Sequence, residues 1–351
     1  MSLIDKMLYS LTLSQLNEIL MAHGFKKYVS EQVFKWLYRQ CNFEITSWSN
    51  ISLAAKNFLQ ENFSIALPQI LRVDHSSDGT KKFLLSLADG EQVETVYIPF
   101  NEERHTICVS SQVGCPMGCI FCLTGQMGFK RNLFAGEIIA QYLAVTFWMR
   151  TNVASDFKLT NMVFMGQGEP LLNFDNVKSA IEILVDSRGI ALGQRKITLS
   201  TSGWVPQIKK LNDFPPVNIA ISLHAVDDVV RSKLMPINNR YDIHALFDAI
   251  KEVHLKAHRR ITYEYLLIED VNDRPEDIDG LTQLISKRDS KINIIPFNDY
   301  PESPFRRPTD AKIIWFQEEL LKRGLVTTIR ASKGKDILAA CGQLKNEFSK
   351  S

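Results

Sequence analysis

From about residue 104 onward, strand-like and helix-like segments alternate, and this alternation is the feature that most constrains the fold of the chain. The strand-like runs cover residues 106–110, 161–165, 196–200, 217–222, 260–267 and 291–296. Between them, apolar residues recur at helical spacing over residues 135–149, 177–186, 243–257, 277–286 and 311–323. Repeated strand-then-helix units predict parallel βα pairing. We therefore expect an α/β fold built on a partial (β/α)6-type TIM barrel.

Two smaller regions precede the expected barrel. Residues 1–65 carry apolar positions at helical spacing and predict a small N-terminal helical domain. Residues 66–100 change to a period of two, with turn signals at Asp78-Gly79 and Asp89-Gly90, and predict a short antiparallel β extension that acts as a linker. The barrel core, including the cysteine near its C-terminal end, would then occupy residues 101–346.

The charges of the chain are nearly balanced, with 41 Lys and Arg against 39 Asp and Glu and a formal net charge of +2. This total gives no general reason to expect a polyanionic partner. Basic pairs are nevertheless scattered along the chain, at Lys26-Lys27, Lys130-Arg131, Arg195-Lys196, Arg259-Arg260 and Arg306-Arg307. Phosphate contacts need such side chains gathered on one face, and the sequence does not show whether they gather. In residues 1–65, the charge pattern alone favours a solvated basic face over an RNA contact.

No stretch of the sequence predicts membrane insertion. The first residues lack a basic region followed by an apolar core, and the longest apolar stretches, such as residues 142–149, are far shorter than the roughly 18 residues that span a bilayer. We therefore expect a cytoplasmic protein without a membrane partner. In a reducing compartment, its six cysteines are expected to serve as metal ligands, nucleophiles or core residues rather than as structural disulfides.

Three of the cysteines form a compact motif after the first strand of the βα series. Cys115, Cys119 and Cys122 have C-x3-C-x2-C spacing. A structural zinc ion takes four protein ligands, and the nearest further candidates, His105 and Cys108, lie upstream in strand context. A [4Fe–4S] cluster held by three cysteines leaves one iron open for a substrate. The motif therefore favours an iron–sulfur cluster over a zinc site or buried free thiols.

Polar residues also follow the other expected strands. Gly166-Gln-Gly-Glu169 follows the second strand, Ser200 ends the third, Ser222-Leu-His224 follows the fourth and Asn298 follows the sixth. In parallel βα folds, ligands bind at the carboxyl ends of the strands. We therefore expect these residues and the cysteine motif to form one site. His224 on its own is more often a structural histidine.

The cysteine spacing, with the aromatic Phe121 directly before Cys122, resembles the signature of the radical S-adenosylmethionine (SAM) superfamily. Further strings resemble the RlmN/Cfr family of RNA adenine methyltransferases over roughly residues 10–346: CVSSQVGC at 108–115, GEPLLN at 168–173, LSTSG at 199–203, ISLH at 221–224, PIN at 236–238, VND at 271–273 and ACGQL at 340–344. The resemblance implies the radical SAM type of barrel, with a [4Fe–4S] cluster and SAM as cofactors.

The resemblance also implies which residues hold these cofactors. Cys115, Cys119 and Cys122 would bind three irons of the cluster, and Gly168 and Glu169 look like the Gly-Glu element that contacts the SAM amino group. The remaining positions that match SAM contacts of the family are Ser200, Ser222, Leu223, His224 and Asn298.

Three more residues acquire roles only through the resemblance. Cys341 matches the family's methyl carrier, Cys108 its resolving cysteine and Glu94 its proton acceptor; the family mechanism uses two SAM molecules per turnover and a transient disulfide between the two cysteines. Taken without the family, Cys108 is more often a buried strand cysteine, Cys341 is evenly balanced and Glu94 passes for a surface residue. Cys41 matches no motif and is expected to be an ordinary buried thiol.

The family implies RNA substrates, and with it we expect the helical domain of residues 1–65 to contact RNA. Its members act on an adenine in the peptidyl-transferase region of 23S rRNA, and some also on the adenine 3′ to the anticodon in tRNA. Val113, the Pro-Leu-Leu string at 170–172 and the Ser-Gly string at 202–203 look like the type that methylates C2. Gln167, where many members carry Met, is neutral. Methylation of C8 is the alternative within the family, and a non-catalytic zinc RNA-binding protein is the alternative outside it. A flavodoxin or ferredoxin as electron donor and a monomeric enzyme complete the expectations.

Overall fold

The computed structural model describes residues 7–300 and 303–345. Its N-terminal region is helical, as expected, with α1 beginning after the capping box of Thr12 and Gln15 and α3 capped by Ser52. The elements of this region are η2 (Leu8–Ser10), α1 (Leu13–Ala22), α2 (Tyr28–Phe34), the π-helical turn η3 (Lys35–Arg39), η4 (Ile45–Ser47) and α3 (Leu53–Asn62).

The centre of the molecule is a sheet of ten strands in the order β1-β2-β3-β4-β7-β8-β9-β10-β11-β12. These strands are β1 (Gln69–His75), β2 (Lys81–Ser86), β3 (Gln92–Pro99), β4 (His105–Cys108), β7 (Asn161–Phe164), β8 (Ile197–Thr201), β9 (Asn218–Ser222), β10 (Ile261–Leu267), β11 (Ser290–Pro296) and β12 (Thr327–Ile329). All neighbours from β4 to β12 pair in parallel, which confirms the open parallel barrel. A separate antiparallel pair joins β5 (Gln112–Gly114) to β6 (Phe129–Asn132).

Two features of the sheet differ from the sequence-based expectation. The antiparallel strands β1 to β3 form no separate linker, because β3 pairs with β4 and places Val96 opposite Cys108, so that they continue the barrel sheet. The parallel series also contains a seventh strand, β12, beside β11. Three residues are too few for a period of two to be recognised, so the sequence did not predict it.

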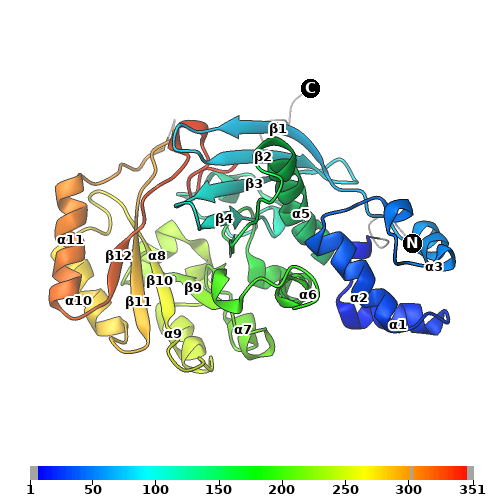
Figure 1. Cartoon of the computed structure of the whole chain (residues 1–351). Coiled ribbons are helices and arrows are strands. Elements are labelled where there is room, and N and C mark those ends of the chain that lie inside the picture. The colour runs from blue at the N-terminus through cyan, green and yellow to red at the C-terminus, as the bar shows by residue number, and fades with distance from the viewer. Residues whose placement is uncertain (1–6, 301–302, 346–351) are drawn as a thin grey trace.

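Helices lie around the outside of the curved sheet, and the N-terminal helices stand at one end of the molecule (Figure 1). Their bounds are α4 (Leu123–Gln126), α5 (Ala135–Asn152), α6 (Phe174–Val185), α7 (Val205–Ile208), α8 (Asp228–Leu234), α9 (Ile243–Lys251), α10 (Pro275–Leu284) and α11 (Asp310–Lys322). Short 3-10 turns are η5 (Pro170–Asn173), η6 (Gln194–Lys196), η7 (Leu211–Asp213), η8 (Pro236–Asn239) and η9 (Lys335–Ile337). Helix α9 ends six residues earlier than expected, because the following segment is charged and exposed and includes the left-handed His258.

Side chains of the barrel strands alternate between the outer helices and the barrel interior. On β10, Tyr263 stacks on Phe247 of α9 and Tyr265 stacks on Phe316 of α11. Glu264, which lies between these two tyrosines, therefore points to the interior. The outward residues form the main hydrophobic core with the helices, whereas the inward residues line the barrel interior.

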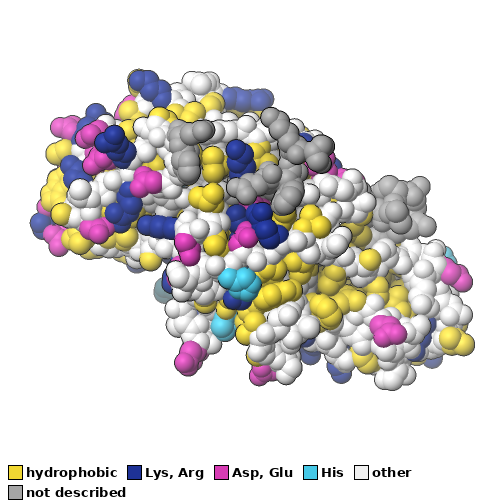
Figure 2. Space-filling model, turned by 90° about the horizontal axis from the view of Figure 1, so that it is seen from above, with side chains coloured by type: hydrophobic (Ala, Val, Ile, Leu, Met, Phe, Trp, Pro, Cys, Tyr) yellow, Lys and Arg dark blue, Asp and Glu magenta, His cyan; other side chains and the backbone are white. Residues whose placement is uncertain are grey.

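The carboxyl ends of β11 and β12 point toward the top of Figure 1, so the view from above in Figure 2 looks onto that end of the barrel. Lys and Arg side chains are spread among Asp and Glu side chains on this face and do not form a single basic patch (Figure 2). Among the described residues, no helix is both long and apolar enough to cross a membrane.

Candidate active site

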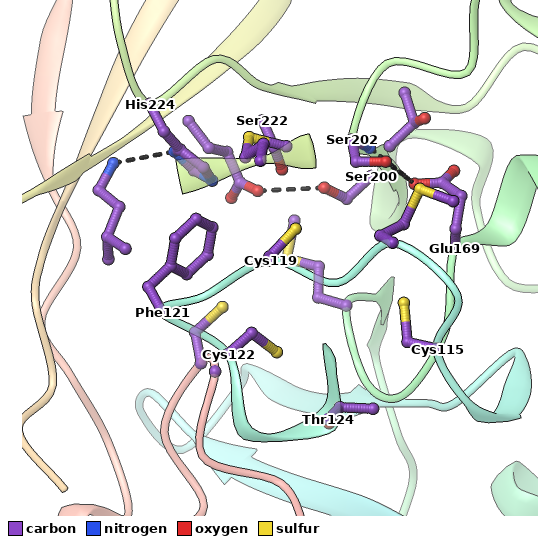
Figure 3. A pocket seen from close by; sticks show the side chains of 18 of the residues that line it. Cys115, Cys119, Phe121, Cys122, Thr124, Glu169, Ser200, Ser202, Ser222 and His224 are labelled. Atoms are coloured by element: carbon purple, nitrogen blue, oxygen red, sulfur yellow. Dashed lines mark hydrogen bonds between the residues drawn. The ribbon is translucent and has the colours of Figure 1, made fainter. Parts of the chain in front are cut away.

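A cavity of about 950 Å³, the upper cavity, opens at the carboxyl ends of the parallel strands. Its lining includes most of the residues that the sequence singles out: Cys115, Cys119, Cys122, Gly168, Glu169, Ser200, Ser222, His224 and Cys341. Figure 3 shows the cysteine loop on one side of the cavity and the serines and Glu169 on the other. The strand-end residues and the cysteine motif therefore lie together, as expected, for eight of these residues; Cys341 was not part of that expectation.

The cysteine loop is held by its own backbone. The amide of Cys115 donates to the carbonyl of Gly128 at 2.9 Å, and the amide of Cys122 donates to the carbonyl of Cys119 at 3.1 Å. Burial raises the pKa of the Cys115 thiol to about 12 and raises the pKa of Cys119 well above its ordinary value. Thiolates at these positions therefore require a strong positive charge beside them, which a bound metal centre supplies.

The three thiols fit an iron–sulfur cluster better than a single metal ion. Within residues 7–300 and 303–345, no three His, Cys, Asp or Glu side chains are arranged to hold one metal ion. A structural zinc ion needs its cysteine sulfurs at about 2.3 Å from one point. In a [4Fe–4S] cluster each thiolate binds a different iron, so the three sulfurs surround a larger body. Three thiols that line one cavity without converging on one point match the second arrangement.

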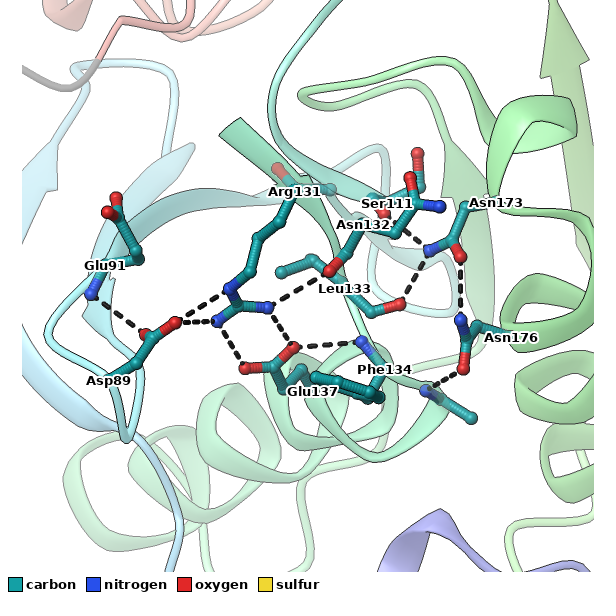
Figure 4. Close-up of polar contacts among 12 residues, drawn as sticks. Asp89, Glu91, Ser111, Arg131, Asn132, Leu133, Phe134, Glu137, Asn173 and Asn176 are labelled. Carbon is teal, nitrogen blue, oxygen red and sulfur yellow. Dashed lines mark hydrogen bonds and ion pairs between the residues drawn. The ribbon is translucent and has the colours of Figure 1, made fainter. Parts of the chain in front are cut away.

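A polar network supports the segment that follows the cysteine loop (Figure 4). Arg131 on β6 donates to Asp89 in the β2–β3 turn at 2.7 Å, and its two terminal nitrogens contact the Glu137 carboxylate at 2.7 and 2.8 Å. The neighbouring Lys130 pairs with Glu91 at 2.8 Å. Both members of the basic pair at residues 130–131 thus have acidic partners, Lys130 at the surface and Arg131 partly buried, and the pair anchors the cysteine loop to the β extension.

Glu169 links the loops that follow β7 and β8. Its Oε2 accepts hydrogen bonds from the amide and the hydroxyl of Ser202, both at 2.7 Å, and its Oε1 accepts from the amide of Leu171 at 2.9 Å. Burial raises the pKa of the carboxyl, and these hydrogen bonds oppose that rise. The preceding Gly168 has φ 103°, and a Cβ there would lie 2.6 Å from Cβ of Gln112, so only glycine fits.

His224 is neutral, and its hydrogen bond determines its tautomer. It adopts a left-handed φ of 60°, and its Nδ1 accepts from the amide of Leu266 at 3.0 Å. Burial, with a smaller contribution from Arg231, lowers the pKa of the imidazole to about 3. The proton therefore resides on Nε2, which is left as a donor in the upper cavity. Phe121 packs edge-on against the ring, with centroids 5.1 Å apart.

Glu264 is a residue of this cavity that the sequence did not identify. It lies on β10, is only 4% exposed, and its Oε2 accepts from Ser200 Oγ at 3.1 Å. Arg330, directly after β12, lies 3.6 Å from its Oε1. A single carboxylate in an otherwise apolar strand is the signal that could have identified Glu264.

Arg231 was also missed, although it organises the loops around the cavity. Its guanidinium is buried and donates to the backbone carbonyls of Ser202, Ser222 and Leu223 at 2.9, 3.0 and 3.0 Å. It also donates to Oδ1 of Asn238 at 2.8 Å. No local pattern marks such a residue, because its partners lie on three separate segments.

A second cavity of about 530 Å³, the cysteine cavity, adjoins the upper cavity and is lined by both Cys108 and Cys341. Arg330 and Asn298 also line it, and Asn298 Nδ2 donates to the Cys341 carbonyl at 3.3 Å. All six cysteines are free thiols, so the structure contains no disulfide. Burial raises the pKa of Cys108 to about 12, and the positive charge of Arg330 opposes this rise.

Four expected site residues lie outside the upper cavity, and one of them, Cys108, lines the cysteine cavity. The Leu223 side chain is buried in the core, and Asn298 lines the cysteine cavity instead. Glu94 lines neither cavity; it is fully buried on β3, with Oε1 3.1 Å from Lys82 Nζ. Cys41 is buried in the helical region, as expected of an ordinary thiol.

An open parallel barrel with three cysteines of a C-x3-C-x2-C loop in its carboxyl-end cavity defines the chain as a radical SAM enzyme. The comparisons with known proteins agree. The model of the radical SAM superfamily matches residues 109–282, and the model of the ribosomal RNA large subunit methyltransferase N-terminal domain matches residues 7–65.

Similar proteins cover almost the whole chain. The dual-specificity RNA methyltransferase RlmN of Syntrophotalea carbinolica is 43% identical over 97% of the chain and 90% of the relative, and that of Nitratiruptor sp. is 44% identical over 92% and 93%. The crystal structure of a radical SAM methyltransferase from Sphaerobacter thermophilus superposes with a TM-score of 0.88 at 40% identity, covering 96% of this chain and 98% of that one. The chain therefore belongs to the RlmN family of radical SAM RNA methyltransferases, whose cofactors are a [4Fe–4S] cluster and SAM.

Proposed function

We propose that the enzyme methylates C2 of an adenine in the peptidyl-transferase region of 23S rRNA, and of the adenine 3′ to the anticodon in tRNA. The observation that carries this proposal is the pair of free cysteines, Cys108 and Cys341, on one cavity directly beside the upper cavity. The name of the similar enzymes, dual-specificity RNA methyltransferase, supports two RNA substrates. The same resemblance supports a cytoplasmic, monomeric enzyme with a flavodoxin or ferredoxin as electron donor.

C2 of adenine lies between two ring nitrogens and is electron-poor, so it does not attack the electrophilic methyl group of SAM. The bound cluster and SAM would supply radical chemistry for this difficult step. Ser200, Ser222 and His224 would position SAM, and the Nε2 hydrogen of His224 is available as a donor. Cys341 lines both cavities and would carry the methyl group from one SAM, to be activated by a second.

The two cysteines would then release the methylated RNA from the enzyme. After hydrogen abstraction from the methyl group on Cys341, the methylene carbon would bond to C2. The adduct would then give up its C2 proton to Glu94 and one electron, for which the cluster held by Cys115, Cys119 and Cys122 would be the acceptor. Cys108 Sγ then bonds to Cys341 Sγ as the sulfur–methylene bond breaks, and the released carbon takes up a proton to become the methyl group. Glu94 is fully buried, and its partner Lys82 also donates to the carbonyl of Leu338 in the C-terminal segment, residues 333–345. The proposed role of Glu94 therefore requires that this segment moves during the reaction.

Nucleoside mass spectrometry of rRNA and tRNA tests the proposal. RNA from cells that lack the protein should contain no 2-methyladenosine at the two positions, and the wild-type gene should restore it. Unchanged 2-methyladenosine, or a methyl group at C8, would overturn the proposed reaction.

A further inference from the structure

An open cavity of about 2650 Å³, the lower cavity, lies at the amino ends of β8 to β11, at the bottom of the barrel in Figure 1. Part of its lining is the other end of the same barrel interior, and much of the rest comes from α9 and the loop before β10. On β10, Leu266 and Glu264 line the upper cavity and Thr262 lines the lower one, together with Arg260 directly before the strand. Alternate residues of a strand share a face, so the side chains of Leu266, Glu264 and Thr262 all face the interior. On β8, Ser200 likewise lines the upper cavity and Thr198 lines the lower one.

The lower cavity is strongly basic although the whole chain carries a net charge of only +2. One acid, Asp289, lines it, against seven basic residues: Arg195, Lys251, Lys256, Arg259, Arg260, Arg288 and Lys291. Two of these cations have acidic partners, because Lys251 lies 2.8 Å from Asp248 and Arg288 lies 3.8 Å from Asp289. The other five form no ion pair with any residue in the described ranges.

The structure holds two of these cations, Arg195 and Arg259, close to one another. Asn218 accepts from the Arg259 guanidinium at 3.0 Å and donates to the backbone carbonyl of Arg195 at 2.8 Å. Burial and the nearby Arg195 lower the pKa of Arg259, as expected when two positive charges face each other. Assembling like charges is unfavourable, and a bound anion offsets that repulsion.

The size and charge distribution of the lower cavity suit several phosphates of a nucleic-acid backbone better than a single phosphate group. Its unpaired cations come from the segment before β8, the loop before β10 and the start of β11, and it is wide and open. Four of them, including Arg195, Arg260 and Lys291, are solvent-exposed. Exposed arginines and lysines spread over several segments are typical of phosphate-backbone contacts. By contrast, charges of both signs mix on the upper face (Figure 2).

We propose that the lower cavity binds backbone phosphates of the substrate RNA, at a distance from the target adenine. This inference rests on the proposed RNA methyltransferase function. Because the two cavities open at opposite ends of the barrel, only an RNA large enough to pass around the barrel contacts both. A short hairpin that enters the upper cavity does not reach the lower one.

RNA-binding measurements with the holoenzyme test this site. In Arg260→Glu/Lys291→Glu, the affinity for a long 23S rRNA fragment should fall at least tenfold at low salt. The slope of log Kd against log salt concentration should decrease by about one for each cation removed. Lys178→Glu/Lys322→Glu is the matched control, because it changes the net charge equally on the outer surfaces of α6 and α11. Arg260→Gln/Lys291→Gln should show a smaller loss in the same direction without charge reversal.

Each outcome decides the proposal. Unchanged affinity and salt slope in Arg260→Glu/Lys291→Glu, or an equal loss in the control, would overturn it. Binding of ATP that Arg260→Gln/Lys291→Gln abolishes, with RNA affinity unchanged, would assign the cavity to a free nucleotide and also overturn it. The proposed function is tested separately, by the position of the methyl group that the wild-type enzyme adds to a short hairpin.

Discussion

At the scale of single residues, the two cysteines of the cysteine cavity make the sharpest prediction. Cys341→Ala should abolish methylation, because no thiol remains to carry the methyl group. Cys108→Ala should leave protein covalently attached to RNA, because the thiol that releases Cys341 is missing. Denaturing gels with labelled RNA measure both results.

Cys41→Ala is the control for this pair, since Cys41 is a buried thiol that lines neither cavity. It should turn over like the wild type. Full turnover in Cys108→Ala or Cys341→Ala would contradict the two-cysteine scheme.

The buried pair of Lys82 and Glu94 predicts a pH-dependent stability. Burial raises the pKa of Glu94 above its ordinary value of 4.5, and the charge of Lys82, 3.1 Å away, opposes that rise. In Lys82→Met the folded-state pKa rises further, so the folded protein holds a proton that the unfolded chain loses. Stability should therefore fall as pH rises above the unfolded pKa, by up to about 3 kcal/mol once Glu94 is ionised without a partner.

Urea unfolding of Lys82→Met at pH 5 and pH 8 measures this effect. Lys81→Met, on the same strand but outside the buried pair, should show little pH dependence relative to the wild type. An equal loss of stability at both pH values in Lys82→Met would show that lost packing, rather than the charge of Glu94, causes the change.

At the scale of elements, residues 333–345 form a C-terminal segment that positions Cys341 from both sides. On one side, Asp336 accepts from Ser76 Oγ at 2.6 Å and from the amide of Ser77 at 3.0 Å. On the other, the amide of Leu123 donates to the carbonyl of Gly342 at 2.8 Å. The segment thus joins the β1–β2 turn to the end of the cysteine loop.

Asp336→Ala should loosen this segment without unfolding the barrel. The hydrogen bonds to Ser76 and Ser77 also lower the pKa of Asp336, so its carboxylate form makes the contact. Hydrogen exchange in residues 334–345 should accelerate, and the rate of methylation should change, with little effect on global unfolding.

Asp248→Ala is the control, because the exposed Asp248 pairs with Lys251 within α9 and not with the C-terminal segment. If hydrogen exchange of the C-terminal segment is the same in both variants, Asp336 does not hold the segment.

At the scale of the whole molecule, the helical region and the barrel are joined at Gly136 on α5. A Cβ at this position would lie 2.0 Å from Ser10 Oγ and 3.2 Å from Met7 Sδ, so the helical region packs directly on the α5 backbone. Gly136→Leu should separate the two parts, because the larger side chain cannot fit between them.

Limited proteolysis between the two parts should then be faster than in the wild type. Thr151→Leu adds a similar side chain at an exposed position near the end of α5 and is the control. Equal proteolysis of Gly136→Leu and the wild type would contradict this close packing.

The sequence by itself determined the class of the barrel, the cysteine motif and most of the upper cavity. These features are local: the spacing of three cysteines, and polar residues placed where strands end. Parallel strands bring their carboxyl ends together, so the order of segments already implied that Ser200, Ser222 and His224 would meet the cysteine loop.

Only the tertiary structure decided which residues from distant segments belong to the site and which expected residues lie outside it. Arg231, Glu264 and Arg330 act through partners on other segments, which no local pattern records. The basic pairs, indistinguishable in the sequence, separated into the neutralised Lys130-Arg131 and the unpaired Arg259-Arg260 of the lower cavity. Whether a charge is neutralised depends on its neighbours in space, and those neighbours are set by the packing of the whole chain.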